Sequence, residues 1–260
     1  MHWYDAVMQT EELVLTNRDG KRMPATLARP QGESKGLVLI LHGLGGWKDL
    51  VLLKKVSDFF LSEGYTTFRF NDSDSIISPD QDHFHSTTTK YTEDLDDVLV
   101  YLRTQEWYSQ PFTLVGHSMG GLIAAWYAAR NPEDVRQLIE LAPAVSWKSM
   151  WFFQLPWALL TMIRGHASLL EIDGKKFRLS PLWWNDFCKF DGYAYARAIT
   201  APTLIVSAER DHTVAKPFVH RSYTKLFRNA QHSTISWADH DFDGHEDEVV
   251  ATIEQWLTSS

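Results

Sequence analysis

"PFTLVGHSMGGLIAAWYAAR", residues 111–130, places a serine between two glycines in the middle of an otherwise apolar stretch. It begins with β-forming residues over 112–115 and ends in an alanine-rich amphipathic run. That run stops at Asn131-Pro132, because proline cannot continue a helix. The stretch therefore predicts a strand, a tight turn over residues 116–120 and a helix. This is the context of a G-x-S-x-G elbow, which exposes a serine on a strained strand-to-helix turn.

The pentapeptide alone does not separate a nucleophilic Ser118 from a small residue in a tight turn. At a strand-to-helix junction both glycines have a structural role, since Gly116 and Gly120 lack the Cβ atoms that would crowd such a turn. A nucleophile also needs a base, an acid that orients the base and donors for an oxyanion. The rest of the chain has to supply them.

Composition limits the class of protein. The chain has 260 residues, of which 44% are hydrophobic, enough for one large α/β domain or two small ones. The net charge of −8 argues against a nucleic-acid partner, because phosphate binding needs a basic surface.

The sequence also bears on the compartment. Cys188 is the only cysteine, so no intrachain disulfide can form, which fits a reducing compartment. Asp5, Glu11 and Glu12 interrupt the apolar core that a signal peptide needs. The longest apolar run, residues 150–163, is too short to span a bilayer. We expect a soluble, cytoplasmic protein without stable membrane insertion; the sequence leaves the oligomeric state open.

Strand and helix patterns alternate along the chain. Residues 12–30 are typical of an antiparallel hairpin, and the later apolar runs are typical of a parallel sheet covered by helices on both faces. The expected strands are 36–43, 66–70, 112–115, 137–141, 202–207 and 233–237. The expected helices include 48–63, 91–105 and a final one with an apolar face over 249–257. The predicted fold class is therefore α/β.

An insertion interrupts this alternation. About 60 residues separate the strands at 137–141 and 202–207, far more than an ordinary connection needs. It contains a hairpin pattern turning at Asp173-Gly174 and five tryptophans: Trp147, Trp151, Trp157, Trp183 and Trp184. We interpret residues 144–199 as a cap or lid, inserted between two parts of the core, 1–143 and 200–260.

The remaining catalytic parts follow Ser118 in the order acid, then histidine, that is typical of such elbows. Asp211 comes just after the strand at 202–207, with Glu209 as an alternative acid, and His240 comes just after the last strand. Ligands of open α/β sheets bind at this carboxyl edge. Ser118, Asp211 and His240 are therefore the candidate triad. Rival histidines outside the "ADHDF" context of His240 are His212, His232 and His245.

The candidate oxyanion donors are two backbone amides. One is that of Met119, directly after the serine, and the other that of Leu44, in the loop "HGLGG" after the first central strand. Gly43, Gly45 and Gly46 allow this loop to curl toward a substrate carbonyl.

Substrate contacts are expected from the same loops and from the cap. The candidates are His42, Gly43, Gly45, Trp47, His117, Trp147, Trp151 and Trp183. A tryptophan-lined cap favours a hydrophobic or aromatic acyl or alcohol group. No cofactor or metal is expected. The segment Asp80–His85 has two histidines near two carboxylates and is a possible metal site. Because no third cluster of ligands is in view, we interpret it as a solvated loop bordering the pocket.

Four motifs carry a resemblance to a known superfamily: "HGLGG" (42–46), "GHSMGG" (116–121), "ERDHTV" (209–214) and "ADHDF" (238–242). On these motifs the chain resembles the α/β-hydrolase superfamily over nearly its whole length. The tryptophan-rich insertion is similar to that of the cinnamoyl/feruloyl esterase-like branch. "GHSMGG" is also similar to monoacylglycerol lipases and serine aminopeptidase-type hydrolases. Where relatives often have a "GHGxS" turn, this chain has Asn71-Asp72-Ser73-Asp74-Ser75.

The expected function is that of a serine carboxylic-ester hydrolase of the carboxylesterase type, acting on small to medium hydrophobic or aromatic esters. The enzymatic alternatives are a monoacylglycerol-type lipase and an amidase or aminopeptidase. A free amine substrate would need an acidic cap residue, for which Glu171, Asp173 and Asp186 are available. A non-catalytic ligand-binding protein of the same fold is the alternative from another class. Residues 150–163 could also lie on a membrane surface, although their polar face is poor in Lys and Arg.

Overall fold

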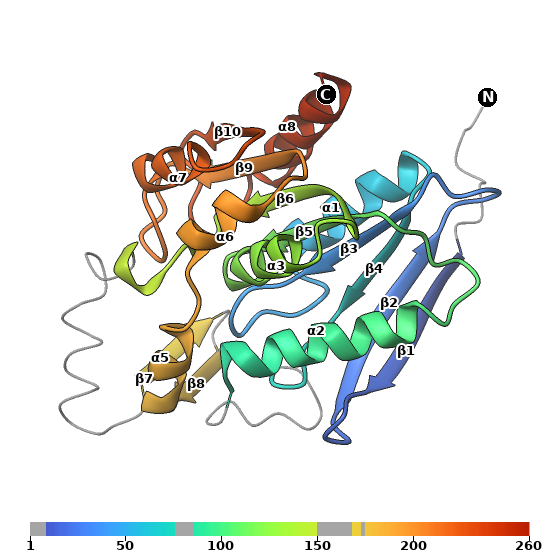
Figure 1. Cartoon of the computed structure of the whole chain (residues 1–260), viewed down its shortest axis with the longest axis horizontal. Coiled ribbons are helices and arrows are strands. Elements are labelled where there is room, and N and C mark those ends of the chain that lie inside the picture. The colour runs from blue at the N-terminus through green and yellow to red at the C-terminus, as the bar shows by residue number, and fades with distance from the viewer. Residues whose placement is uncertain (1–8, 76–85, 150–167, 173–174, 260) are drawn as a thin grey trace.

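A computed structural model describes residues 9–75, 86–149, 168–172 and 175–259 of the chain, in an alternating β/α order (Figure 1). The strands are β1 (Gln9–Thr16), β2 (Arg22–Arg29), β3 (Leu37–Leu41), β4 (Thr66–Phe70), β5 (Phe112–His117), β6 (Val135–Leu141), β7 (Ser168–Ile172), β8 (Lys175–Leu179), β9 (Thr203–Ala208) and β10 (Ala230–Ile235). The helices are α1 (Val51–Ser62), α2 (Thr88–Leu102), α3 (Met119–Arg130), α5 (Pro181–Phe187), α6 (Gly192–Ala198), α7 (Pro217–Thr224) and α8 (Glu246–Ser259).

Eight of these strands form one sheet in the order β1-β2-β4-β3-β5-β6-β9-β10. β1 and β2 pair antiparallel, as the hairpin pattern predicts, and β2 also runs antiparallel to β4. The other five pairings of this sheet are parallel. The carboxyl ends of β3, β5, β6, β9 and β10 therefore meet at one edge of the sheet. The predicted mostly parallel α/β architecture is confirmed.

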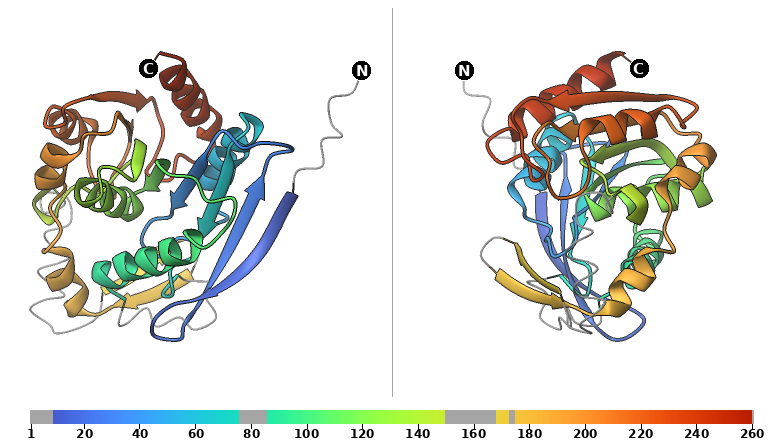
Figure 2. Two further views of the ribbon diagram at one scale, coloured as in Figure 1. Left: turned by 45° about the vertical axis from the view of Figure 1, so that its right-hand side comes forward. Right: turned by 90° about the vertical axis from the view of Figure 1, so that its left-hand side faces the viewer.

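β3 is apolar throughout because both faces of the sheet are covered. In β3, Leu37, Leu39 and Leu41 pack in the core on one side, and Val38 and Ile40 in the core on the other. The first core lies under α2, α3, α6 and α7, and the second lies under α1 and α8. The turned views show these two helical layers with the sheet between them (Figure 2).

The boundaries of β10 differ from the sequence prediction at both ends. β10 was predicted over 233–237 from its apolar residues, but it pairs with β9 from Ala230 and ends at Ile235. β10 lies at the edge of the sheet, where a strand can carry polar residues, and Trp237 turns the chain away with φ 66°.

Four described elements lie between β6 and β9. β7 and β8 form a separate antiparallel hairpin, and α5 and α6 pack beside α2 and α3 respectively (Figure 1). The hairpin was predicted; the two residues of its turn, like Trp151, Trp157 and the apolar run 150–163, lie outside the described residues. The division into core and cap remains a prediction.

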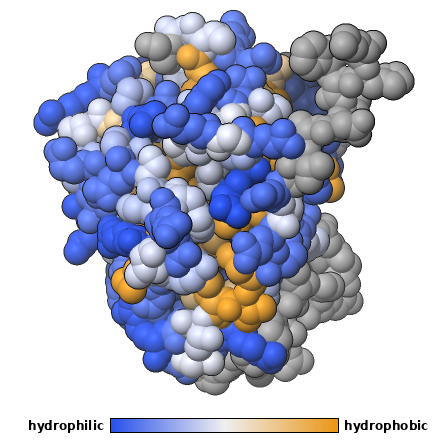
Figure 3. All heavy atoms as spheres, turned by 90° about the vertical axis from the view of Figure 1, so that its right-hand side faces the viewer, coloured by the Kyte–Doolittle hydropathy of each residue, from blue (hydrophilic) through white to orange (hydrophobic). Residues whose placement is uncertain are grey.

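The surface on one face of the molecule and the character of the helices bear on contact with a membrane. The face of the molecule on the right-hand side of Figure 1 is mostly hydrophilic (Figure 3). None of the helices in the described ranges combines the length and the apolar character that a bilayer crossing requires.

Candidate active site

Ser118 lies at the junction of β5 and α3, on a backbone with φ 55° and ψ −119°. A non-glycine residue in this region is strained and persists only where its surroundings hold it. A Cβ atom at Gly116 would overlap the carbonyl oxygen of Gly120, and a Cβ at Gly120 would overlap that of His42. Only glycine therefore fits at these two positions, which is the geometry that a G-x-S-x-G elbow requires.

His240 connects Ser118 to Asp211. Its Nε2 atom lies 2.9 Å from Oγ of Ser118, and its Nδ1 atom lies 2.8 Å from Oδ2 of Asp211. Because an ionised carboxylate only accepts, Nδ1 carries the proton and Nε2 is free to accept that of the serine hydroxyl. All three side chains are buried. The loops after β5, β9 and β10 thus bring together the three residues selected from the sequence.

Both oxygens of the Asp211 carboxylate accept hydrogen bonds. Its second oxygen, Oδ1, accepts from the backbone N–H groups of Thr213 and Val214 at 2.7 and 2.9 Å. Burial raises the pKa of Asp211, but the hydrogen bond from His240 and these backbone donors outweigh burial and hold the pKa below its usual value. Asp211 is therefore ionised at neutral pH.

The alternative residues lie elsewhere. Glu209 accepts from the backbone N–H of Trp237 at 2.7 Å and does not contact His240 through any described hydrogen bond. The rival histidines have other partners: Ser207 for His232, Lys216 for His212 and Glu248 for His245.

The charges around His240 raise its pKa above that of a free histidine, so its ring stays protonated up to a higher pH. Burial lowers the pKa of His240, but the hydrogen bond and charge of Asp211, with Asp241 and Asp239 nearby, raise it above 6.5. For the neighbouring His117, burial and the charge of His240 lower the pKa to about 4. His117 is therefore neutral across the range in which His240 titrates.

The loop after β3 lies directly against the serine. A Cβ atom at Gly43 would come within 2.9 Å of the Ser118 Cβ and 3.4 Å of its Oγ. Gly45 takes φ 66°, a conformation that favours glycine. Within the described part of the chain, no acceptor binds the backbone N–H of Leu44 or of Met119. Met119 is the first residue of α3, where helical N–H groups have no partner within the helix.

Residues 71–75, directly after β4, hold this loop through hydrogen bonds. Asn71 Oδ1 accepts from the backbone N–H of Lys48 at 2.6 Å, and Ser75 Oγ donates to the Gly46 carbonyl at 2.6 Å. The backbone N–H of Asp72 donates to Nε2 of His42 at 3.1 Å. All five residues of the segment are buried. Sequence reasoning missed this role, although a polar run directly after a buried strand is a signal of it.

Several predicted substrate contacts have protein partners instead. In His42, Nδ1 donates to the Gly43 carbonyl at 2.8 Å and Nε2 accepts from Asp72, so no ring nitrogen is left for a ligand. The His117 ring is 3% exposed and bonds to the backbone of His240. This geometry fits positioning roles for both histidines better than substrate contact.

The predicted tryptophan contacts have mixed positions. Trp183 is 2% exposed and stacks on Phe187 with ring centroids 4.9 Å apart, so it packs in the core. Trp47 and Trp147 are half-buried beside that core, and Trp151 lies outside the described residues.

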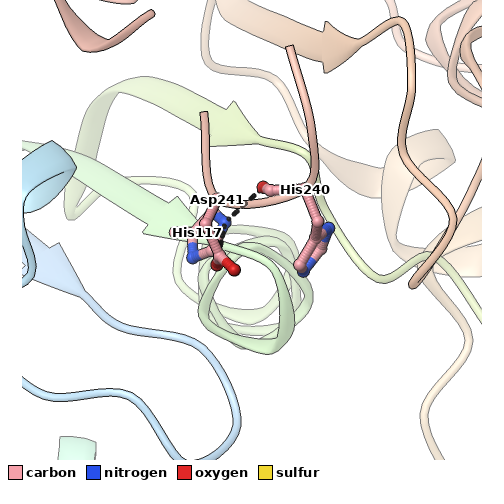
Figure 4. Close-up of side chains that lie close together, drawn as sticks. All are labelled: His117, His240 and Asp241. Atoms are coloured by element: carbon pink, nitrogen blue, oxygen red, sulfur yellow. Dashed lines mark hydrogen bonds and ion pairs between the residues drawn. The ribbon is translucent and has the colours of Figure 1, made fainter. Parts of the chain in front are cut away.

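One group of side chains in the described residues has the composition of a metal site. Ligand atoms of His117, His240 and Asp241 lie within 4.8 Å of one another (Figure 4). Both ring nitrogens of His240 are already bound to Ser118 and Asp211, and His117 Nε2 faces the His240 carbonyl. A metal ion here would have to break the triad, so we assign it no role. Asp80–His85 lie outside the described residues.

Comparison with protein families adds to this geometry. Residues 32–178, more than half of the chain, match the model of the family described as serine aminopeptidase, S33. The chain belongs to this α/β-hydrolase family. The predicted superfamily is thereby confirmed, including the resemblance to serine aminopeptidase-type hydrolases.

Solved structures of other α/β-hydrolase-fold proteins are similar over almost the whole chain. Est1E from Butyrivibrio proteoclasticus, solved with ferulic acid bound, has a TM-score of 0.79 at 21% identity, covering 95% of this chain and 98% of that one. Alpha/beta hydrolase domain-containing protein 10 from mouse has a TM-score of 0.76 at 16% identity, with 96% and 99% covered. At these identities the likeness shows the fold alone.

A curated relative matches only in part. An uncharacterized protein of Synechocystis sp., sll0249, is 37% identical over 78 residues, and this chain spans 30% of that protein's length.

Proposed function

We propose that the chain is a serine carboxylesterase that acts through an acyl-enzyme on small to medium hydrophobic or aromatic esters. The observation that carries this proposal is the continuous contact from Ser118 through His240 to Asp211, at 2.9 and 2.8 Å. A protein that only binds a ligand has no need of a buried imidazole held between a strained serine and an ionised carboxylate.

The mechanism follows from these contacts. His240 Nε2 accepts the hydroxyl proton of Ser118 as Oγ attacks the ester carbonyl carbon. Asp211 keeps the proton on Nδ1 and stabilises the imidazolium. The amides of Leu44 and Met119 donate to the tetrahedral oxyanion. His240 then protonates the leaving alcohol, and water repeats the cycle on the acyl-enzyme. Every step uses groups of the protein and needs no metal or organic cofactor.

Two observations bear on the substrate class. Est1E, which shares the fold, was solved with the aromatic acid ferulic acid, and the insertion of this chain is rich in tryptophan. We propose an uncharged acyl group of this kind, without a nucleic acid or membrane partner. Because the chain has a single cysteine and can form no intrachain disulfide, we propose the cytoplasm as its compartment.

One observation weighs against an aminopeptidase, although the family carries that name. A free amino group would need an acidic partner from the cap, and Asp186 is engaged elsewhere. Its oxygens accept from the Thr89 N–H and hydroxyl at 2.8 and 2.7 Å and from Lys189 Nζ at 2.7 Å. Asp186 thus fastens α5 to the first turn of α2. The side chains of Glu171 and Asp173 lie outside the described ones.

The test is an ester series with one matched variant. Purified protein is assayed against p-nitrophenyl acetate, butyrate, octanoate and decanoate, methyl ferulate and an aminoacyl p-nitroanilide, beside Ser118→Ala. Hydrolysis of short or aromatic esters that Ser118→Ala abolishes supports the proposal. A preference for decanoate indicates a monoacylglycerol-type lipase, and turnover of the anilide alone an aminopeptidase. Stoichiometric binding of these esters without turnover, in a folded protein, would indicate a binding protein.

A further inference from the structure

His117, the residue before the serine, holds the loop of the catalytic histidine. Its Nε2 atom lies 3.0 Å from the backbone carbonyl oxygen of His240, across 123 positions of the chain (Figure 4). The centroids of the two imidazole rings lie 5.1 Å apart. The ring of Phe242 packs edge-on against that of His117, with 6.5 Å between their centroids. His117 thus connects the end of β5 to the loop after β10, which no strand pairing between β5 and β10 does.

The direction of this hydrogen bond is fixed by chemistry. A carbonyl oxygen only accepts, so Nε2 of His117 carries the proton and Nδ1 presents a lone pair. That Nδ1 atom is buried and has no hydrogen-bond partner in the described structure. A buried acceptor without a partner is costly, by about 1–3 kcal/mol. An apolar side chain would avoid this cost, so the bond from Nε2 is what the histidine contributes here.

The loop that His117 holds is bonded to Glu209 and Arg210 at its start, through Trp237 and Ala238, but in the described residues no other hydrogen bond reaches the His240 carbonyl. The loop contains two non-glycine residues at positive φ, Trp237 and Phe242, with His240 between them. The position of His240 Nε2 relative to Ser118 Oγ depends on where this strained backbone lies. A displacement of about 1 Å in a catalytic group can lower the rate about 10²-fold.

We propose that His117 is a positioning residue, which anchors the carbonyl of His240 so that its imidazole stays within hydrogen-bond reach of both Ser118 and Asp211. This inference rests on the proposed esterase function. It replaces the substrate contact predicted for His117 from the sequence.

The charged groups around the pair come from two loops. His240 and Asp241 face His117 from the loop after β10, with Nε2 of His117 3.8 Å from Asp241 Oδ1, and Asp211 faces it from the loop after β9. Asp239 also acts on His240. Burial and the charge of His240 lower the pKa of His117, which keeps its ring neutral, so it neither competes for the serine proton nor repels the imidazolium.

Three substitutions separate the hydrogen bond from packing. His117→Gln keeps an N–H donor near the position of Nε2, His117→Asn places its amide too close to the backbone to reach, and His117→Leu has no donor. We expect kcat to fall about 10–100-fold in the Leu and Asn variants with KM within about twofold of wild type. The Gln variant should stay within about threefold of wild type.

A pH profile distinguishes positioning from a general loss of structure. If the loop relaxes, the contact between His240 and Asp211 lengthens, and burial then lowers the pKa of His240. The acidic limb of kcat/KM should therefore move to lower pH in the Leu and Asn variants and remain in place in the Gln variant. Melting temperature and circular dichroism are measured for each variant.

Each outcome has a clear meaning. A folded Leu variant with wild-type kcat and pH profile overturns the inference. A Gln variant whose kcat falls as far as that of the Asn variant overturns it too. If the Leu variant does not fold, the contrast between Gln and Asn decides in the same way. Ser118→Ala is run in the same assay, and full hydrolysis by that variant would contradict the proposed function itself, independently of His117.

Discussion

His240 Nε2 and Ser118 Oγ lie 2.9 Å apart, although 122 positions separate the two residues in the chain. The distance is a product of the sheet, because parallel β5, β6, β9 and β10 lie side by side and deliver their loops to one edge. The pKa of His240 and the strain at Ser118 both depend on this arrangement.

Asp211→Asn should change both the rate and the pH dependence of hydrolysis. In the proposed mechanism neutral His240 is the base, so activity should be lost as the pH falls through its pKa, which is raised above the usual histidine value in the wild type. Without the Asp211 charge, burial lowers this pKa, and the acidic limb of kcat/KM should move to lower pH. We expect kcat to fall about 10³–10⁴-fold, because asparagine no longer holds the proton on Nδ1.

Glu209→Gln is the matched control for this prediction, because Glu209 binds the Trp237 backbone instead of His240. Its rate and profile should equal those of wild type. If Glu209→Gln shifted the acidic limb and Asp211→Asn did not, the assignment of the acid would be reversed.

Gly120→Ala should destabilise the protein, because the added Cβ would overlap the carbonyl oxygens of Leu41 and His42. We expect a loss of about 3 kcal/mol in the free energy of unfolding, measured with urea. Gly32→Ala is the control, since Gly32 has φ 85° but open space around it. It should cost about 1 kcal/mol from backbone strain alone. Equal losses in the two variants would contradict close packing at the elbow.

Asn71→Ala should impair the chemical step more than binding. It removes the acceptor of the Lys48 N–H and frees the loop that carries Leu44. Oxyanion stabilisation acts in the transition state, so kcat should fall about 10–100-fold with KM within about twofold. Asn229→Ala, at an exposed asparagine, is the control. An increase in KM alone would mean that the loop binds substrate without stabilising the oxyanion.

The sequence predicts the parts of this molecule whose side-chain pattern is repetitive or whose chain order is fixed. β3 is apolar because both faces of the sheet are covered, and Asp211 and His240 follow Ser118 in the order that the fold requires. β10 was misplaced because an edge strand can be polar, as it is over Gln231–Thr234.

The partners of individual histidines could not be predicted in this way. His42 and His117 were both expected to contact substrate, but each binds a backbone group that is remote in the sequence. Residue type and strand-end position do not reveal which way an imidazole points or which nitrogen carries the proton. Only the tertiary arrangement determines these partners.

Glu140 gives a prediction for stability instead of catalysis. It lies in β6 with no exposed surface, and one carboxyl oxygen accepts from the Tyr223 hydroxyl at 3.2 Å. Burial raises its pKa to about 8. Between 4.5 and about 8 the folded state therefore holds a proton that the unfolded state has released. Stability contributed by this group is complete below 4.5 and is lost as the pH rises through about 8.

Urea unfolding of wild type and Glu140→Gln at pH 5, 7 and 9 checks this sign. The wild type should lose stability relative to the Gln variant as the pH rises, because glutamine stays neutral. Tyr223→Phe should extend the loss to higher pH, since the Tyr223 hydroxyl is the donor that lowers the pKa of Glu140. Parallel curves for wild type and Glu140→Gln would mean that Glu140 is ionised in the folded protein at all three pH values. In that case the core around β6 and α7 would have to supply a compensating positive charge, which no described residue there provides.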